Sequence, residues 1–320
     1  MSTPFDVAAE VHAAEGRSRP YLLTTPVVPS IGLSADVGSA AVLKCEHLQH
    51  TGSFKARGAV SKLLSLTPEE LERGVITAST GNHGAAIAYA GGIVGVAPTV
   101  VVPEDANPAK LAVIERLGGH IEVHGSDSVD SELGARRIAA ERGLTFVSPY
   151  NDPAIIGGQG TIGLELLEQV DDLAAVYVAV GGGGLSSGVA GILKSVSPST
   201  RVIGCSPSKS AVMYHSLRAG RILDMPSDPT LSDGTAGGVE PGAVTLQLLD
   251  SLLDDFVTVE EDDIRRAFID LIDVEHLLVE GSAAMAYAAA RAHGRAVEGT
   301  TAVILCGGNV GSGRLREILA

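Results

Sequence analysis

Short runs of β-branched and other apolar residues alternate with stretches of helical periodicity along most of the chain. In its middle, the pattern predicts strands at 75–78, 99–102, 121–123 and 145–147, separated by helices at 84–90, 108–117 and 129–141. A second series predicts strands at 174–180, 202–204 and 302–305, helices at 160–169 and 185–196, and a loop at 220–245. The alternation predicts an α/β protein built from βα units around parallel sheets.

The composition narrows the classes of function. With 320 residues, 45% of them hydrophobic, the chain is long enough for a large core in one large domain or two. Its 23 basic and 38 acidic residues give a formal charge of −15, and the basic residues are scattered. This disfavours a nucleic acid or an anionic membrane as partner and favours a small metabolite. No apolar run approaches the roughly 20 residues that a membrane span requires.

Cysteine usage indicates the compartment. Cys45, Cys205 and Cys306 are far apart and form no CxxC pair, and the N-terminus carries no basic and apolar leader. Both features predict a reducing, cytoplasmic location.

One lysine stands out. Lys55 lies among small and aromatic residues in the segment 51–59, where a strand end leads through a loop into a helix. Such a junction lies at the edge of a sheet, where α/β proteins bind ligands. Desolvation there would lower the pKa of the lysine and free its amine to attack a carbonyl. The alternative is a surface lysine whose aliphatic stem lies along a helix start.

A polar turn at 79–84 joins a predicted strand to a predicted helix. Its backbone N–H groups and hydroxyls lie at the positive end of the helix dipole, which favours a carboxylate ligand. The alternative is an ordinary N-cap, in which Ser79, Thr80 or Asn82 satisfies unpaired amides.

Residues 181–184 are four consecutive glycines that follow a strand and, with Leu185, open a helix. Their unshielded N–H groups can bind a phosphate at the helix N-terminus. A P-loop would require Gly-Lys-Ser/Thr, whereas Val189 follows Gly188. A dinucleotide fingerprint would require an acid after the next strand, which ends in Cys205-Ser206-Pro207. A monophosphate therefore fits better than a nucleotide.

Cys306 ends a strand and precedes two glycines. A thiol in this position is usually a packed core residue, but it can also be a weak, uncharged hydrogen-bond partner for a ring nitrogen. A reactive lysine, a phosphate cradle, a carboxylate seat and a neutral partner for a ring nitrogen are together what pyridoxal 5′-phosphate needs for amino-acid chemistry.

The chain resembles the fold-type-II pyridoxal-phosphate enzymes, and within them the serine/threonine dehydratase and serine racemase group. The resemblance implies two open twisted α/β domains with mainly parallel sheets, like those of the tryptophan synthase β chain. Closure of the small domain would expel water. A homodimer is expected on the same basis. The matching segments are 25–26, 46–59, 79–84, 158–161, 181–185 and 307–309. The large cofactor-binding domain would comprise 1–73 and 151–320, and the small mobile domain, which holds the substrate carboxylate, 74–150.

The resemblance also implies a role for each site residue. Lys55 would bind the cofactor covalently and then act as acid and base at Cα. Phe54 would pack beside the ring, Asn82 would bind its 3′-oxygen and Cys306 would face its nitrogen. The phosphate would be held by Gly181, Gly182, Gly183, Gly184 and Leu185, and the substrate carboxylate by Ser79, Thr80, Gly81 and His83.

A neutral partner leaves the ring nitrogen unprotonated, which favours β-elimination over transamination. The expected activity is that of a dehydratase (ammonia-lyase), which converts serine, threonine or a related β-hydroxy amino acid into a 2-oxo acid and ammonia. The alternative is a serine or aspartate racemase, with Thr80 as proton carrier opposite Lys55. The Thr80 hydroxyl could equally bind the substrate or cap the helix. A nicotinamide-dependent oxidoreductase and a silent binding module are the remaining hypotheses.

Further features refine the resemblance. The segment 206–212 lacks carboxylates, so we expect no divalent-cation site of the serine racemase kind and no metal. The chain ends soon after Asn309, so we expect no C-terminal regulatory domain. Glu280 would line the site or be a solvated acid at a helix start. Segments 77–84, 151–165 and 279–282 look most like dehydratases of hydroxyectoine utilisation.

Overall fold

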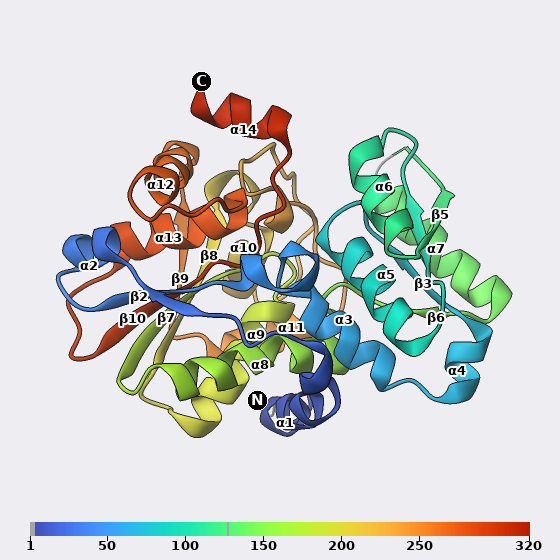
Figure 1. Ribbon diagram of the computed structural model, residues 1–320, viewed down its shortest axis with the longest axis horizontal. Helices are drawn as coiled ribbons and strands as arrows, with labels where there is room; N and C mark the ends of the chain where they lie inside the picture. The colour runs from blue at the N-terminus through green and yellow to red at the C-terminus, as the bar shows by residue number, and fades with distance from the viewer. Residues whose placement is uncertain (1–3, 127) are drawn as a thin grey trace.

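The computed structural model describes residues 4–126 and 128–320, and its strands form two sheets covered by helices (Figure 1). The strands are β1 (Val27–Pro29), β2 (Ala41–Lys44), β3 (Val75–Ala78), β4 (Thr99–Val102), β5 (His120–Val123), β6 (Thr145–Phe146), β7 (Leu173–Ala179), β8 (Arg201–Pro207), β9 (Asp255–Val259) and β10 (Thr300–Ile304). The helices are α1 (Val7–Ser18), α2 (Ile31–Val37), α3 (Lys55–Leu64), α4 (Pro68–Arg73), α5 (Asn82–Val94), α6 (Pro108–Arg116), α7 (Ser128–Arg142), α8 (Pro153–Gln169), α9 (Gly184–Val196), α10 (Val212–Ala219), α11 (Val244–Leu252), α12 (Glu261–Asp273), α13 (Gly281–His293) and α14 (Ser312–Leu319). Short 3-10 helices connect them at η1 (Arg19–Tyr21), η2 (Glu46–Leu48), η3 (His50–Gly52), η4 (Ser208–Ser210) and η5 (Asp233–Thr235).

The larger sheet has the strand order β1-β2-β10-β7-β8-β9, and the smaller one the order β5-β4-β3-β6. Every neighbouring pair is parallel except β1 and β2. The predicted α/β class with mainly parallel sheets is therefore confirmed. All strands of the smaller sheet lie between residues 75 and 146, and with α5, α6 and α7 they form what we call the small unit (Figure 1). The domain boundaries and the mobility of this unit stay predictions.

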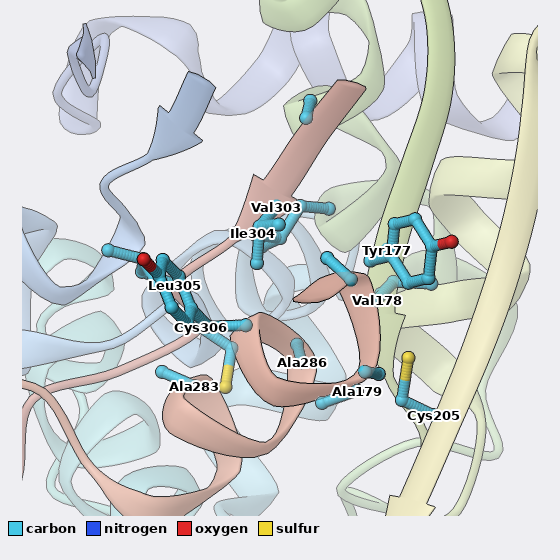
Figure 2. Close-up of a cluster of buried hydrophobic side chains, with 14 of the residues drawn as sticks. Tyr177, Val178, Ala179, Cys205, Ala283, Ala286, Val303, Ile304, Leu305 and Cys306 are labelled. Atoms are coloured by element: carbon cyan, nitrogen blue, oxygen red, sulfur yellow. The ribbon is translucent and has the colours of Figure 1, made fainter. Parts of the chain in front are cut away.

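Helices cover both faces of the larger sheet, with α12 and α13 on one side and α8 and α9 on the other (Figure 1). The largest apolar core lies there, and it includes β7, β10 and most of α13 (Figure 2). Parallel strands covered on both faces are apolar throughout, which is why β7 and β10 are buried along almost their whole length. None of the described helices is long and apolar enough to cross a membrane.

The predicted helix at 160–169 begins seven residues earlier, at Pro153 of α8. Asp152 caps this helix by accepting from the Ala154 and Ile155 amides, and Pro153 takes the first-turn position that suits it. The predicted strand at 202–204 extends to Pro207, and the loop at 220–245 contains η5 and the first residues of α11. The glycines of α8 are packing sites: a Cβ on Gly160 would lie 2.8 Å from the Gly188 carbonyl oxygen of α9.

A buried ion network holds α3, the helix that Lys55 opens. The Arg57 guanidinium lies between Glu46 and Glu165, at 2.7 Å from each carboxylate. Lys44 of β2 donates to the other oxygen of Glu165, and all four side chains are buried. Burial would raise the pKa of Glu165, but Arg57 and Lys44 lower it to about 2, so Glu165 stays ionised. The network connects η2, α3 and α8 to β2 of the larger sheet.

We predict that Arg57→Met will strongly destabilise the protein, because it leaves Glu46 buried without its cation. Removing one partner of a buried pair costs about 3–5 kcal/mol. Arg137, which is exposed and pairs with Glu141 at 3.1 Å one helical turn away, provides the matched control. Its replacement by Met should change the free energy of unfolding by less than about 0.5 kcal/mol. Urea unfolding of both variants measures the difference, and equal losses would contradict the prediction.

Candidate active site

Four segments of the candidate site follow the carboxyl ends of parallel strands. β2, β10 and β7 are neighbours in the larger sheet, and they lead to the Lys55 segment, to Cys306 and to the glycine loop at 181–184. β3 of the small unit leads to the polar turn at 79–83. The order of the strands therefore brings together residues that are more than 200 positions apart in the chain, at the edge where α/β sheets bind ligands.

Lys55 is the first residue of α3, and its position is fixed from both sides. The Phe54 amide donates to the Cys306 carbonyl oxygen at 3.0 Å, and the Lys55 Nζ donates to the Pro149 carbonyl oxygen at 2.8 Å. The Phe54 ring centre lies 5.2 Å from that nitrogen. Burial lowers the pKa of Lys55 to about 8, and the neighbouring Cys306 and Glu280 oppose that shift. The surface-lysine alternative is therefore wrong, and the amine is partly deprotonated near neutral pH.

The polar turn leaves the N-terminus of α5 without a side-chain cap. Gly81 stands at the N-cap position, and the Ser79 hydroxyl accepts from the Gly81 amide at 3.1 Å. The alternative that Ser79, Thr80 or Asn82 caps the helix is therefore wrong. Thr80 is half-buried, and its hydroxyl has no hydrogen bond within residues 4–126 and 128–320. The first-turn amides and this hydroxyl remain free to bind an anion.

His83 is neutral in this environment. Burial, reinforced by the Lys55 charge, lowers the pKa of its imidazole to about 3. Its Nε2 lies 3.4 Å from the Val147 carbonyl oxygen. Because a carbonyl only accepts, Nε2 carries the hydrogen, and the ring is committed to the backbone of the small unit. The group that His83 offers to a carboxylate is its backbone N–H in the first turn of α5.

The glycine loop leaves no room for side chains. A Cβ on Gly182 would lie 2.4 Å from the Tyr150 ring, and one on Gly184 would lie 2.9 Å from the Tyr150 Cα. Gly183 forms the N-cap of α9 with a φ of +90°, a conformation that glycine adopts without strain. Tyr150 directly follows Pro149, the acceptor of Lys55, so the loop lies next to the lysine.

An unpaired hydroxyl marks the same helix start. Ser187 Oγ, in the first turn of α9, is buried and finds no hydrogen-bond partner in the part of the chain that the structure describes. Buried hydroxyls are normally satisfied, so this one indicates a missing polar ligand. The Leu185 side chain is buried in the apolar core, which leaves only its backbone to face that ligand.

Glu280, immediately before α13, connects the remaining polar groups. The Asn82 Nδ2 donates to both of its carboxyl oxygens, at 2.9 and 3.2 Å, and the Cys306 Sγ lies 3.8 Å from Oε1. Asn309 in turn donates to the Asn82 Oδ1 at 2.8 Å. Glu280 is only 4% exposed, so the alternative of a solvated helix-start acid is wrong. Its burial raises the pKa of its carboxyl to about 7, with the Asn82 bond opposing that shift.

Cys306 is a core residue, as one interpretation of its sequence context predicts, and its role toward a ring nitrogen stays a prediction. It is buried in the apolar core together with Ala283 and Leu305 (Figure 2). Burial, and next to it the Glu280 charge, raises the pKa of its thiol well above the usual value, so the thiol is protonated. It is thus a core residue whose sulfur also has a polar partner.

These residues fit a phosphorylated heteroaromatic aldehyde. The desolvated Lys55 amine suits a carbonyl, the bare amides beside Ser187 suit a phosphate, and the neutral thiol suits a ring nitrogen. Within residues 4–126 and 128–320, no three His, Cys, Asp or Glu side chains gather to hold a metal ion. A two-sheet α/β fold with this site defines the class of pyridoxal-phosphate enzymes.

Comparison with known proteins identifies the family. The family described as "Pyridoxal-phosphate dependent enzyme" matches residues 19–307, and the chain belongs to it. A putative threonine dehydratase of Sinorhizobium fredii is 36% identical, over 97% of this chain and 94% of its own. A serine racemase of Oryza sativa is also 36% identical, over 98% and 94% of the two chains. The crystal structure of a threonine deaminase of T.th. superposes with a TM-score of 0.87 at 38% identity, over 95% and 98%. The predicted cofactor, pyridoxal 5′-phosphate, is confirmed.

Three groups of the site were not singled out by the sequence: Pro149, Tyr150 and the Ser187 hydroxyl, whose missing partner only the structure reveals. Pro149, which holds Lys55 through a backbone carbonyl, carries no signal, because any residue supplies that group. Tyr150 lies against the glycine loop through a contact that depends on the fold. Asn309, by contrast, lies in a matching segment, and its bond to Asn82 explains the need for an amide there.

We predict that Ser187→Ala will weaken cofactor binding without destabilising the cofactor-free protein. The hydroxyl has no partner to lose, so the unfolding free energy of that form should stay within about 0.5 kcal/mol or rise. Loss of one hydrogen bond to a charged phosphate should weaken affinity for pyridoxal 5′-phosphate by about tenfold, from a contribution of about 1.5 kcal/mol. Ser186→Ala, whose hydroxyl already donates to the Gly183 carbonyl oxygen, is the neighbouring control. Unchanged affinity in Ser187→Ala would contradict the assignment.

We also predict a pH-dependent effect of Glu280→Gln on the cofactor-free protein. The folded-state pKa of about 7 lies above the unfolded value of 4.5, so this group contributes stability below pH 4.5 that is lost as the pH rises through 7. The glutamine has no such loss. The stability of the variant relative to the native chain should therefore be greater at pH 8 than at pH 5 by about 2 kcal/mol. Urea unfolding at both pH values measures this, and a relative stability independent of pH would contradict it.

Proposed function

We propose that this pyridoxal-phosphate enzyme is a dehydratase (ammonia-lyase) that eliminates water from serine, threonine or a related β-hydroxy amino acid. The observation that supports this proposal is that the candidate site, within the described residues, has one competent base, Lys55, and no second base next to Thr80. Lys55 has an amine whose pKa burial lowers to about 8, whereas the Thr80 hydroxyl has no base bonded to it in the described chain. One competent base removes a Cα proton and supports elimination; racemisation needs a second one on the other face.

The proposed roles follow from the site. Pyridoxal 5′-phosphate, when bound, supplies an electron sink that stabilises negative charge at Cα. Lys55 takes the Cα proton, and the Pro149 carbonyl keeps its nitrogen beside the glycine loop. The Phe54 ring, adjacent to that nitrogen, packs beside the cofactor ring. The backbone amides of 181–185, with the Ser187 hydroxyl, hold the phosphate.

The start of α5 orients the substrate. Ser79, Thr80, Gly81 and the backbone of His83 receive the carboxylate at the positive end of the helix, and the neutral His83 ring adds no charge of its own. Because these residues belong to the small unit, its movement toward the larger sheet, with 74–150 as the proposed mobile domain, would exclude water. Exclusion of water would protect the reactive product of elimination until it leaves as a 2-oxo acid and ammonia.

The second candidate is a serine or aspartate racemase. The dehydratase and racemase relatives match this chain with the same identity, so the likeness supports both. Thr80 is half-buried within the carboxylate seat, where a hydroxyl can donate a proton to the opposite face of Cα. In the racemase the Thr80 hydroxyl would donate a proton to Cα, whereas in the dehydratase it would only bind the substrate carboxylate.

The finer assignments belong to the same proposal. The segments 77–84, 151–165 and 279–282 support a place among dehydratases of hydroxyectoine utilisation. We further propose a cytoplasmic homodimer without a divalent cation. Three free cysteines support a reducing compartment, and the absence of carboxylates from 206–212 supports independence of divalent metals.

We predict that the loaded enzyme will release 2-oxo acid from L-serine, L-threonine or hydroxyaspartate faster than it forms a D-amino acid. Lys55→Ala should reduce the rate about a thousand-fold or more, because it removes the base and the covalent attachment. Thr80→Val should lose racemisation and keep elimination with a raised KM, because the Thr80 hydroxyl also belongs to the carboxylate seat. The measurement follows 2-oxo acid and D-enantiomer in parallel. Faster formation of the D-enantiomer would favour the racemase, and full activity of Lys55→Ala would refute both proposals.

A further inference from the structure

Glu280 contacts Asn82 and Cys306, the two side chains proposed to bind polar atoms of the cofactor ring. Asn82, proposed to bind the 3′-oxygen, donates to both oxygens of its carboxyl, and Cys306, proposed to face the ring nitrogen, has its sulfur 3.8 Å from one of them. Asn82 is the first residue of α5 in the small unit, whereas Cys306 follows β10 of the larger sheet. A single carboxyl group therefore bridges the two polar partners of the ring.

The surroundings hold this carboxyl in place. Glu280 is 4% exposed, and its backbone amide donates to the Gly307 carbonyl oxygen at 2.9 Å. A Cβ on Gly307 would lie 2.6 Å from the carboxyl carbon, so glycine is required for the close approach. The charged or titratable groups that act on the carboxyl are Asp233 of η5, Lys55 of α3 and Cys306; Asn82 and Asn309 are neutral.

The carboxyl has two hydrogen-bonding arrangements with the thiol. As a carboxylate it only accepts, so the Cys306 S–H donates to it and a sulfur lone pair faces away from Glu280. As a protonated acid it can donate its own hydrogen, which frees the Cys306 S–H for another acceptor. Burial raises the pKa of Glu280 to about 7, so both arrangements are populated near neutral pH.

We propose that Glu280 is a positioning residue for the cofactor ring, whose proton determines whether Cys306 presents a thiol hydrogen or a sulfur lone pair to the ring nitrogen. The inference rests on the proposed placement of the cofactor. With Glu280 protonated, the ring nitrogen accepts a hydrogen bond and stays unprotonated, the state that favours elimination. With Glu280 ionised, the nitrogen loses that bond. No covalent bond changes, and the only group that gains or loses a proton is the carboxyl.

The test uses the enzyme loaded with pyridoxal phosphate that carries ¹⁵N at the ring nitrogen. The ¹⁵N chemical shift reports hydrogen bonding at that atom, and the visible band reports the Lys55 linkage independently. In the native enzyme the ¹⁵N shift should move with pH, with a midpoint within about one unit of 7. Glu280→Gln should lose this movement and hold the low-pH shift, because its amide hydrogens leave the thiol hydrogen free.

Three further variants identify the titrating group. Cys306→Ser keeps a donor and should keep the transition, whereas Cys306→Ala should abolish it. Asp233→Asn should keep the transition with a lower midpoint, since the Asp233 charge raises the pKa of Glu280 and the Asp233 side chain is more than half exposed. These variants keep the test decisive even where Glu280→Gln folds poorly.

The outcomes separate the two proposals. An enzyme that takes up the cofactor and releases 2-oxo acid, but whose ring-nitrogen transition persists in Glu280→Gln or in Cys306→Ala, overturns this inference alone. A chain that takes up no pyridoxal phosphate, or from which borohydride fixes none on Lys55, overturns the proposed placement and this inference with it.

Discussion

The placement of Lys55 depends on the buried ion pairs of Arg57, two residues further along α3. The guanidinium spans Glu46 of η2 and Glu165 of α8, and Lys44 binds the second oxygen of Glu165. Charges removed from water are stable only when every partner is in place. The first turn of α3 therefore has one permitted position relative to the larger sheet. The network therefore positions the Lys55 amine through the backbone of α3, although this amine has no bond to the network itself.

The site itself is governed by desolvation. Burial is the largest influence on Lys55, His83 and Glu280, and it moves each pKa toward the neutral form of its group. Near pH 7 the His83 ring is therefore neutral, Glu280 is close to half-protonated, and Lys55 is mostly protonated with a fraction of free amine. Apart from Lys55, a bound anionic cofactor and substrate therefore meet hydrogen-bond donors and backbone dipoles rather than positively charged side chains. Small changes in occupancy of the site would redistribute protons between Lys55 and Glu280.

The sequence predicted the segments of the site better than the elements around it. Lys55, the turn at 79–83 and the glycine loop follow strand ends, and polar or glycine residues in such places have a local signal. Helix α13 has no such local signal. It is apolar on all sides and buried for ten residues from Gly281, so its sequence shows no helical periodicity. The early start of α8 was missed because glycines that allow close helix contact resemble helix breakers. The place of Glu280 in the site could not be predicted, because it depends on a contact with Asn82, which lies 198 positions away in the chain. No local sequence pattern contains such a contact.

Packing requires the glycines of the loop at 181–184 whether or not the protein is active. Tyr150 and Thr235 fill the space over 181, 182 and 184, so packing alone excludes a larger residue at these positions. A descendant that had lost all catalysis would still need them to fold. The four glycines are therefore a marker of ancestry rather than of activity. Ser187 is different, because packing does not require its hydroxyl, and its replacement in a related chain would be an early sign that the phosphate is no longer bound.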